Sequence, residues 1–307
     1  MPFNHALLSS WSRWAPQNAF ARETLTEIGR SLFEDTIRYS GPVQRLWLMF
    51  AERLRWNQEE ARLVLKCEDE ALANLPWECI FDAANIGFVA LRVHFWRELR
   101  GLKSSRPGNR ALIVASNPSH DLNLEEEVER CTPHWSNLFE ETCILKDGTK
   151  GAITRELRER PCALFHFAGH SALMLHEDVR ATSWMKVGGR GVETSEAFHA
   201  GELAGLVASA GPQLAVLNSC WSGQHQAGSL LYEFDKTGVA NIIAMNQPAN
   251  DAAAIQFAST LYAALAGGAS LERGLTHARR RVCEEYGHSM AWGLPTAAFS
   301  TPELCLR

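Results

Sequence analysis

The chain has 307 residues, of which 46% are hydrophobic and 21% charged, with 30 Lys and Arg against 35 Asp and Glu. This composition excludes disordered, collagen-like and low-complexity chains, and the length suits one large α/β domain or two smaller ones that share an interface. The formal charge of −5 gives no electrostatic reason to expect nucleic acid or an acidic membrane surface as partner.

The eight cysteines stand singly, with no Cys-x-x-Cys pair and no Cys/His pair at zinc-ligand spacing. No secretory leader is recognisable, so we expect a reducing, cytoplasmic location. The longest apolar run near the start, Leu46–Ala51, is far shorter than the roughly 20 residues of a membrane span. We therefore expect no membrane span.

The first 105 residues predict a small helical and partly antiparallel section. Residues 1–17 show no period and are expected to form a tail or an irregular packing arm. Apolar spacing predicts two helices and two extended stretches, over residues 25–32, 43–54, 62–67 and 87–93. Gly41-Pro42 should separate the helices, and a turn at Leu75-Pro-Trp-Glu78 should separate the strands.

From Arg110 onward the pattern changes to short apolar strands that alternate with longer amphipathic segments. The predicted strands are 111–115, 142–145, 163–167, 214–217, 240–245 and 296–299. Strands that are apolar throughout are buried on both faces, which indicates a mostly parallel six-stranded sheet with helices on both faces. Asp251 should begin a helix that ends at Gly267-Gly268, and Ser270 should begin the next.

Residues 176–200 form the longest stretch without a clear period and are rich in glycine. A segment of this kind is either a mobile surface loop or a lid over a site. Both readings remain open from the sequence.

Two of the predicted strands run into reactive side chains. The first leads through Gly169 to His170, and the second ends in Asn218-Ser219 before Cys220. In parallel α/β sheets, ligands bind at the carboxyl ends of the strands, so an imidazole and a thiol would meet there if the two strands are neighbours. That imidazole and a helix beginning at Cys220, with free backbone N–H groups, would favour the thiolate that attacks carbonyls. Taken singly, Cys220 is better explained as an inert core thiol and His170 as a hydrogen-bonded histidine.

Seven blocks of the chain, taken together, resemble a known family. They are Leu75–Glu78 with Phe88–Leu91, Ala111–Pro118, His166–His170, Leu217–Cys220, Gly238–Met245, Phe257–Tyr262 and Gly268–Arg279. In this order, over residues 25–300, they resemble the CHAT domain, a caspase-like peptidase family of clan CD related to separase and the CRISPR-associated TPR-CHAT protease. The 50 residues between His170 and Cys220 match the caspase spacing.

The resemblance implies a caspase-like three-layer sandwich, with a supporting section over residues 1–105 and a catalytic section over 106–307. It implies a dyad of His170 and Cys220, and an oxyanion site made by the backbone N–H groups of Ser171 and Cys220. Ser171 stands where caspase relatives often have glycine, and Trp221 follows the nucleophile where smaller residues are common. Trp221 is therefore expected to cover the thiol.

Substrate recognition is assigned to Trp221, Met245 and Asp251. Asp251 follows the strand that ends at Met245, a region that contributes to the primary specificity pocket of related peptidases, and an acidic pocket would favour Arg or Lys before the cut. The alternative is that Asp251 simply caps the helix that it begins. No cofactor is expected.

Several other patterns in the sequence do not indicate a functional site. His166 and His170 lack a third ligand for zinc, so His166 is expected to be buried with a hydrogen-bond partner. Gly188–Gly191 lacks the ending of a phosphate loop, and no metal site is expected. Arg279–Arg281 is expected to be a solvated helix face, and Glu125–Glu129 a negative first helical turn.

These observations favour a cysteine endopeptidase that acts on a specific intracellular protein. A pore-forming or defence effector in a bacterium is the expected kind of substrate, and an activating partner protein is a further expectation. The alternative is a non-catalytic caspase-like module that recruits partners through its sheet edge or the 176–200 segment.

Overall fold

We describe the chain from a computed structural model, which covers residues 22–38, 41–56, 61–99, 103, 105–106, 108–175, 181–188, 195–224, 227–287, 289 and 291–306. The predicted arm over residues 1–17 lies outside these ranges. Among the helices in the ranges described, none combines the length and the apolar character needed to cross a bilayer.

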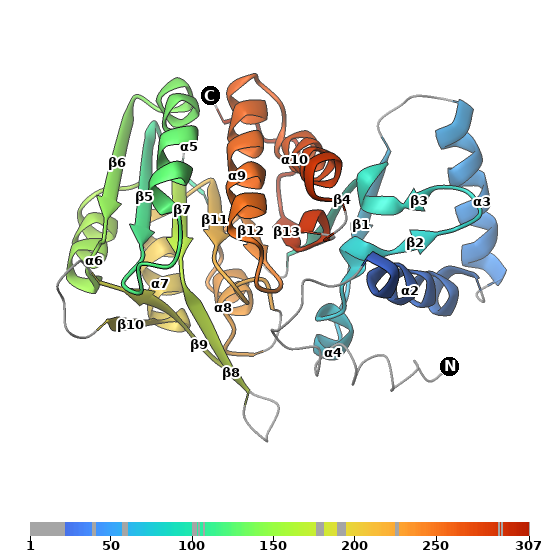
Figure 1. The fold of residues 1–307 in the computed structure, drawn as a ribbon, viewed down its shortest axis with the longest axis horizontal. Coiled ribbons are helices and arrows are strands. Elements are labelled where there is room, and N and C mark those ends of the chain that lie inside the picture. Colours follow the sequence, from blue (N-terminus) through green and yellow to red (C-terminus); the bar gives the residue numbers. More distant parts are fainter. Residues whose placement is uncertain are drawn as a thin grey trace.

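An eight-stranded sheet forms the centre of the molecule (Figure 1). Its order is β1-β4-β13-β12-β11-β7-β5-β6, and every adjacent pair is parallel except β12 and β13. Two parallel blocks of strands therefore meet at one antiparallel pair. The strands span Arg62–Leu65 (β1), His94–Glu98 (β4), Arg110–Ser116 (β5), Glu141–Lys146 (β6), Leu164–Gly169 (β7), Leu214–Asn218 (β11), Asn241–Met245 (β12) and Pro295–Phe299 (β13).

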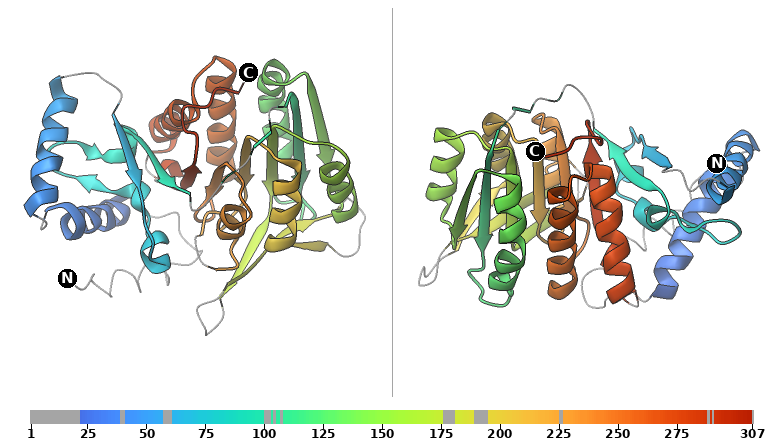
Figure 2. Two further views of the ribbon diagram at one scale, coloured as in Figure 1. Left: turned by 180° about the vertical axis from the view of Figure 1, so that it is seen from behind. Right: turned by 90° about the horizontal axis from the view of Figure 1, so that it is seen from above.

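Helices cover both faces of the sheet (Figure 2). One face packs against α5 (Leu124–Leu138), α9 (Asp251–Ala266) and α10 (Leu271–Tyr286). The other packs against α6 (Lys150–Glu159), α7 (Ala200–Ala210) and α8 (Leu230–Lys236). Because β5, β7, β11, β12 and β13 are buried along their whole length, each must face apolar helices on both sides. The predicted fold class is confirmed.

The leading section is part of the same sheet. It contains α2 (Arg22–Phe33), α3 (Gly41–Trp56) and α4 (Glu70–Ala73), and its β1 and β4 extend the six predicted strands to eight. The six-strand count was too low because β1, a half-buried strand of the leading section, joins the main sheet instead of a separate one. It does so by pairing with β4, 32 residues further on, Arg62 with His94. The division at residue 105 stays a prediction.

The second predicted strand of that section, over residues 87–93, is mostly wrong. Only β3 (Gly87–Phe88) is extended there, paired with β2 (Phe81–Asp82), and a 3₁₀ turn over Val89–Leu91 follows before β4. Val89 and Ala90 are both fully buried. Burial of consecutive side chains fits a turn inside the core better than a strand with one solvated face.

Arg279 corrects another expectation, because it is fully buried rather than solvated. Its guanidinium donates to the carbonyl oxygens of Phe95 on β4 and Pro295 on β13, at 2.8 Å each. Backbone pairing between those two strands is confined to Ala298 and Phe299, so the guanidinium bridges them where they diverge. Burial lowers the pKa of Arg279 to about 10. Arg281, by contrast, is exposed and lies near Glu284 and Glu285 as expected.

The segment 176–200 is more regular than its composition suggested. It contains β9 (Ala181–Val187) and β10 (Glu196–His199), which form a three-stranded antiparallel sheet with β8 (Ser171–Leu175). Side chains of β9 alternate between buried and half-buried positions, the pattern of a strand with one covered face. Residues 176–180 and 189–194 lie outside the described part, so a lid there stays a prediction.

Candidate active site

The two reactive residues follow neighbouring strands. β7 and β11 are parallel and pair Phe167 with Leu217 and Ala168 with Asn218. The expectation that these strands are neighbours is thus confirmed. His170 and Cys220 each follow two residues after the last pair, so they lie level with each other at the carboxyl edge of the sheet.

Gly169 brings the end of β7 close to β5. Its φ is 154°, and a Cβ added there would lie 2.3 Å from the carbonyl oxygen of Ser116. A larger residue would push the two strand ends apart. The glycine therefore sets His170 beside the loop that follows β5.

Asp121, on that loop, contacts His170. Its Oδ1 lies 2.7 Å from Nε2 of the imidazole. The loop is held by Asn117, whose side chain accepts from the N–H of Asp121 at 3.3 Å and donates to the carbonyl of Leu122 at 2.8 Å. Sequence reasoning missed Asp121, although it follows a strand of the parallel sheet by five residues and so belongs to the same edge.

The Asp121 contact defines the state of the imidazole. Desolvation by itself would raise the pKa of Asp121. The hydrogen bond with His170 and the charge of His170 lower it by more, so the pKa of Asp121 lies below the usual carboxyl value. An ionised carboxylate accepts but does not donate, so Nε2 of His170 carries a proton. In the neutral ring Nδ1 is then the basic nitrogen.

The thiol of Cys220 is only partly exposed. Burial raises its pKa above the ordinary thiol value. Hydrogen bonds with backbone groups at Ala249 and at Cys220 itself oppose this shift, whereas the carboxylates of Asp121 and Asp251 reinforce it. The resting thiol is therefore protonated at neutral pH, and nucleophilic attack requires a base to take its proton.

Cys220 begins a turn rather than a helix, which corrects the predicted helix start. Residues 220–223 form the turn, and the next helix, α8, begins at Leu230. Ser222 donates its hydroxyl to the carbonyl of Leu217 at 2.9 Å, and Gly223 donates its N–H to the carbonyl of Met245 at 2.8 Å. These bonds tie the turn to β11 and β12. Trp221 has φ of 60°, an uncommon conformation for a bulky residue.

Ser171, the first residue of β8, contacts the turn that begins at Cys220. The N–H of Lys186 bonds to the carbonyl of His170 at 2.9 Å, so Ser171 and Met185 form a non-hydrogen-bonded pair of the β8–β9 ladder. The N–H of Ser171 consequently points away from β9. The hydroxyl of Ser171 donates to the carbonyl of Cys220, which joins β8 to the turn over residues 220–223.

Asp251 does not cap its helix, so that alternative is wrong. The cap is Asn250, whose side chain accepts from the N–H of Ala253. Asp251 is the first residue of α9, and its half-buried carboxylate accepts from the N–H of Asn123 at 2.7 Å. Desolvation raises the pKa of Asp251. The carboxylate of Asp251 is close enough to the thiol of Cys220 to raise the pKa of that thiol.

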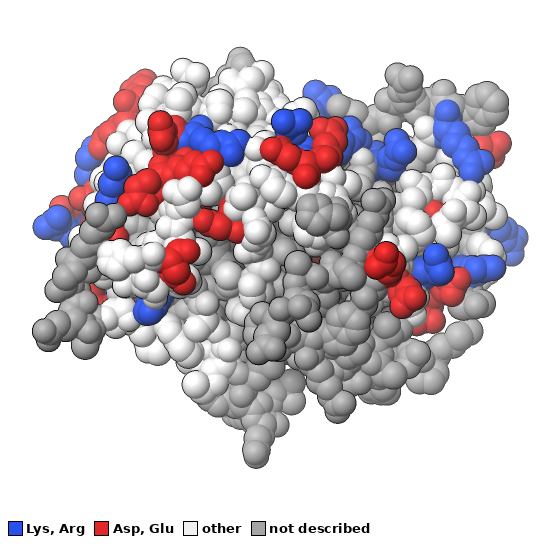
Figure 3. All heavy atoms as spheres, viewed as in Figure 1, with Lys and Arg blue, Asp and Glu red and all other residues white. Residues whose placement is uncertain are grey.

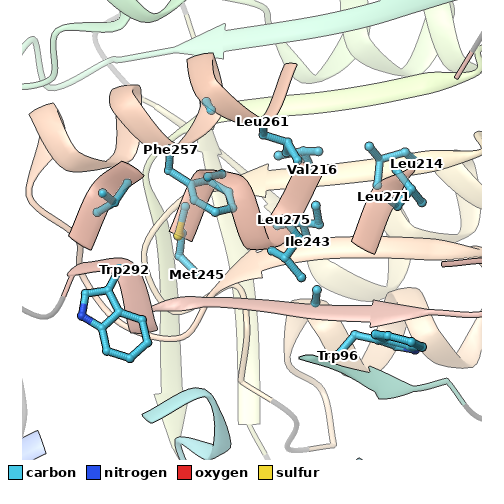
Figure 4. Packing of buried hydrophobic residues seen from close by; sticks show 14 of the residues in the cluster. Trp96, Leu214, Val216, Ile243, Met245, Phe257, Leu261, Leu271, Leu275 and Trp292 are labelled. Carbon is cyan, nitrogen blue, oxygen red and sulfur yellow. The ribbon is translucent and has the colours of Figure 1, made fainter. Parts of the chain in front are cut away.

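Met245, the third expected substrate contact, is placed elsewhere. Its side chain is 3% exposed and lies in the hydrophobic core with Phe257 and Trp292 (Figure 4). A strand buried on both faces directs every side chain into a layer of helices. Met245 therefore offers no surface to a substrate in this structure, and only its backbone contacts the turn over residues 220–223.

A buried polar network lies directly behind the strand ends. His166 Nδ1 is 2.8 Å from the hydroxyl of Tyr262, and its Nε2 is 3.1 Å from Oε1 of Glu127. Asn218 donates to the same Glu127 oxygen at 2.7 Å. The expectation of a buried, hydrogen-bonded His166 is confirmed. Glu125, Glu126 and Glu127 lie in the first turn of α5, as the expected negative first turn requires. Of these, Glu127 is 2% exposed, and its side chain contacts β7 and β11.

Among the residues that the structure describes, no three His, Cys, Asp or Glu side chains are grouped so that they could hold a metal ion. The reactive groups at the edge are thus a thiol, an imidazole, carboxylates and backbone N–H groups. Such a set is suited to acyl transfer.

Comparison with known proteins gives a family and a fold. The sequence model of the CHAT domain matches residues 40–302, most of the chain. A search among curated proteins found no match.

Solved structures with similar folds include cysteine proteases. The crystal structure of the Arg-specific cysteine proteinase gingipain R superposes with a TM-score of 0.58 at 10% identity, over 87% of this chain and 70% of that one. The complex of the pro- and mature domains of Porphyromonas gingivalis RgpB gives 0.57, at 10% identity, over 87% and 71%. The separase–securin complex of Saccharomyces cerevisiae gives 0.49, at 12% identity, over 78% of this chain and 16% of that one. The fold is thus the caspase-like fold.

Proposed function

The chain belongs to the CHAT domain family, and from that premise we propose that it is a cysteine endopeptidase with Cys220 as nucleophile and His170 as general base and acid. The observation that carries this proposal is the register of β7 and β11, which sets the two residues level at one edge of the sheet. A thiol and an imidazole following adjacent strands have no structural need of each other, but acyl transfer needs both.

The reaction has two halves. Nδ1 of His170 takes the proton of the Cys220 thiol as the sulfur attacks the scissile carbonyl carbon, and the imidazolium then gives that proton to the departing amine. The C–N bond breaks, and a thioester remains. Water, deprotonated by the same imidazole, attacks the thioester and releases the acid and the thiol. The ionised Asp121 stabilises the imidazolium in both halves and acts as a positioning residue.

The backbone N–H groups of Ser171 and Cys220 are proposed to hold the oxyanion. Support comes from the bond between the Ser171 hydroxyl and the Cys220 carbonyl, which fixes the two residues relative to each other. Losing one such donor typically costs about 10²- to 10³-fold in kcat.

A basic residue before the cut is proposed from Asp251. Its carboxylate is half-buried at the edge that carries Cys220, and burial strengthens its attraction for a cation. Trp221, in the turn after the nucleophile, is proposed to contact the substrate. Gingipain R is named as Arg-specific, but the proposal for this chain rests on Asp251 itself.

The test is incubation of the purified chain with the products of its neighbouring genes. We expect discrete fragments with the wild type and none with Cys220→Ala or His170→Ala. Cys305→Ala, which alters an exposed cysteine remote in sequence from the dyad, is the matched control and should cleave as the wild type does. Fragments that persist with Cys220→Ala would rule out the mechanism.

The second candidate is a non-catalytic interaction module, and the raised pKa of Cys220 is the observation that favours it. Under that hypothesis the wild type and Cys220→Ala retain the same partner equally well and cleave nothing. A peptidase instead retains its substrate only when Cys220 is replaced.

A further inference from the structure

A hollow of about 390 Å³ lies beside the candidate active site and takes no part in the steps described above. It is bounded by the ends of β5 and β6, the first turns of α5 and the loop between β5 and α5. Leu122, Leu124 and Val128 form an apolar part of its lining, and the polar part is formed by Asn117, His120, Glu125, Lys146 and Asp147.

One loop separates this hollow from His170. Asp121 contacts the imidazole, whereas its two neighbours, His120 and Leu122, line the hollow. The loop is stiffened by the two hydrogen bonds of the Asn117 side chain. The hollow therefore lies next to the proposed base, and the loop that positions His170 also forms a wall of the hollow.

The backbone around the hollow is held in an uncommon conformation at two points. His120 has φ of 56° and Asp147 has φ of 52°. Residues other than glycine are unfavourable there, and such positions cluster at ligand sites. His120 is held by its N–H bond to Asn117 at 3.1 Å, and Asp147 by its N–H bond to Ala115 at 2.7 Å. Two residues in an unfavourable backbone conformation thus form part of the wall of the same hollow.

The proposed reaction indicates which part of the substrate would enter the hollow. The base must return its proton to the departing amine, so the residues after the cut leave on the His170 side of the thiol. The strands run in the order β12, β11, β7, β5, β6. Cys220 follows β11 and His170 follows β7, so the departing segment extends toward β5 and β6, where the hollow lies.

We propose that the hollow binds an apolar side chain from one of the first two residues after the cleaved bond. The inference rests on the proposed peptidase function and adds a specificity determinant on the departing side. The side chains of Leu122, Leu124 and Val128 select an aliphatic or aromatic side chain, and the two carboxylates of Glu125 and Asp147, against the single cation of Lys146, disfavour an acidic one. One methylene more or less in such a pocket changes kcat/KM by about 10-fold or more.

The first experiment is cleavage of a peptide mixture, with the cut sites read by mass spectrometry. The wild type should favour Leu, Met or Phe over Gly at one of the two positions after the cut by about 10-fold. Leu122→Trp fills the hollow and should abolish the preference, and Leu122→Ala enlarges it and should shift the preference toward aromatic residues. Preference before the cut should not change. Leu46→Trp is the matched control, because Leu46 is 67% exposed on α3, and α3 lies far from β5, β6 and α5 (Figure 1).

The second experiment needs no turnover. Saturation-transfer NMR should detect leucinamide, a free amine bearing one apolar side chain, on the wild type and on Leu122→Ala but not on Leu122→Trp. Glycinamide should give no signal on any of them. Unchanged preferences after the cut in both Leu122 variants, or no leucinamide signal on the wild type, would overturn the inference. Cleavage that survives Cys220→Ala, with leucinamide still bound, would overturn the peptidase proposal instead.

Discussion

Asp121 is the residue on which the chemistry of the edge depends most. It is 2.7 Å from His170, and its charge also raises the pKa of the Cys220 thiol. A carboxylate in this position helps the imidazole to accept a proton but opposes a free thiolate. The Cys220 thiol is thus protonated at rest, and under the proposed mechanism it gives up its proton only during attack.

These opposed effects give a prediction for Asp121→Asn. Turnover should fall by about 10²-fold, the lower end of what positioned proton transfer contributes. The pH midpoint of Cys220 alkylation by iodoacetamide should nevertheless move to lower pH, because a negative charge that disfavours the thiolate has been removed. Rate measurements on peptide substrate and alkylation profiles between pH 6 and 11, about two units either side of an ordinary thiol pKa, check both effects.

Asp121→Glu, which keeps the carboxylate, should recover part of the turnover. A purely structural role for Asp121 would lower turnover and leave the alkylation profile of Asp121→Asn at the wild-type pH. That outcome would contradict the assignment.

At the scale of elements, the edge that carries His170 and Cys220 depends on how β7 and β11 are held by α5, which packs against them. Glu127 of α5 accepts hydrogen bonds from side chains of both strands, His166 and Asn218, four and two residues before the dyad positions. The three side chains are each less than 9% exposed. Buried polar groups of this kind fix one arrangement of their elements because any other leaves them unpaired.

We predict that Glu127→Ala lowers the free energy of unfolding by about 3 kcal/mol or more, since it leaves two buried polar side chains without their partner. Glu129→Ala, two residues further along α5 and exposed, should change it by less than about 0.5 kcal/mol. Urea unfolding of the two variants measures both values. Equal effects would mean that the network does not anchor the strands.

At the scale of the whole molecule, the sheet runs without a break from the leading section into the section that carries His170 and Cys220. β4 pairs with β13, and Arg279 bonds to the backbone of both strands. Trp292 packs against Phe88 with their ring centroids 4.9 Å apart, and both are buried. Charges on the face drawn in Figure 3 are mixed in sign over both sections.

The shared sheet predicts how the chain responds to being cut at the proposed boundary. Residues 106–307 alone would expose the edge of β13 and the surface around Trp292, so we expect this fragment to aggregate. Coexpressed with residues 1–105 as a separate chain, it should copurify and unfold in one transition. Gel filtration and calorimetry check this, and a soluble, monomeric 106–307 fragment would show that the catalytic section folds independently.

The sequence by itself determined the buried strands, the helices that separate them and the places of His170 and Cys220 just after two of those strands. It could do so because strands buried on both faces are apolar throughout, and because His170 and Cys220 each directly follow such a strand. The matching motifs determined the family.

Only the tertiary structure decided what surrounds that pair. Asp121 and Glu127 lie between 39 and 91 residues from the side chains that they contact. The hollow beside Leu122 follows no periodic pattern in the sequence. The burial of Arg279 and Met245 and the two added strands were decided in the same way. Contacts between distant segments depend on strand order and register, which set every side chain's neighbours and which local propensity and hydrophobic period do not encode.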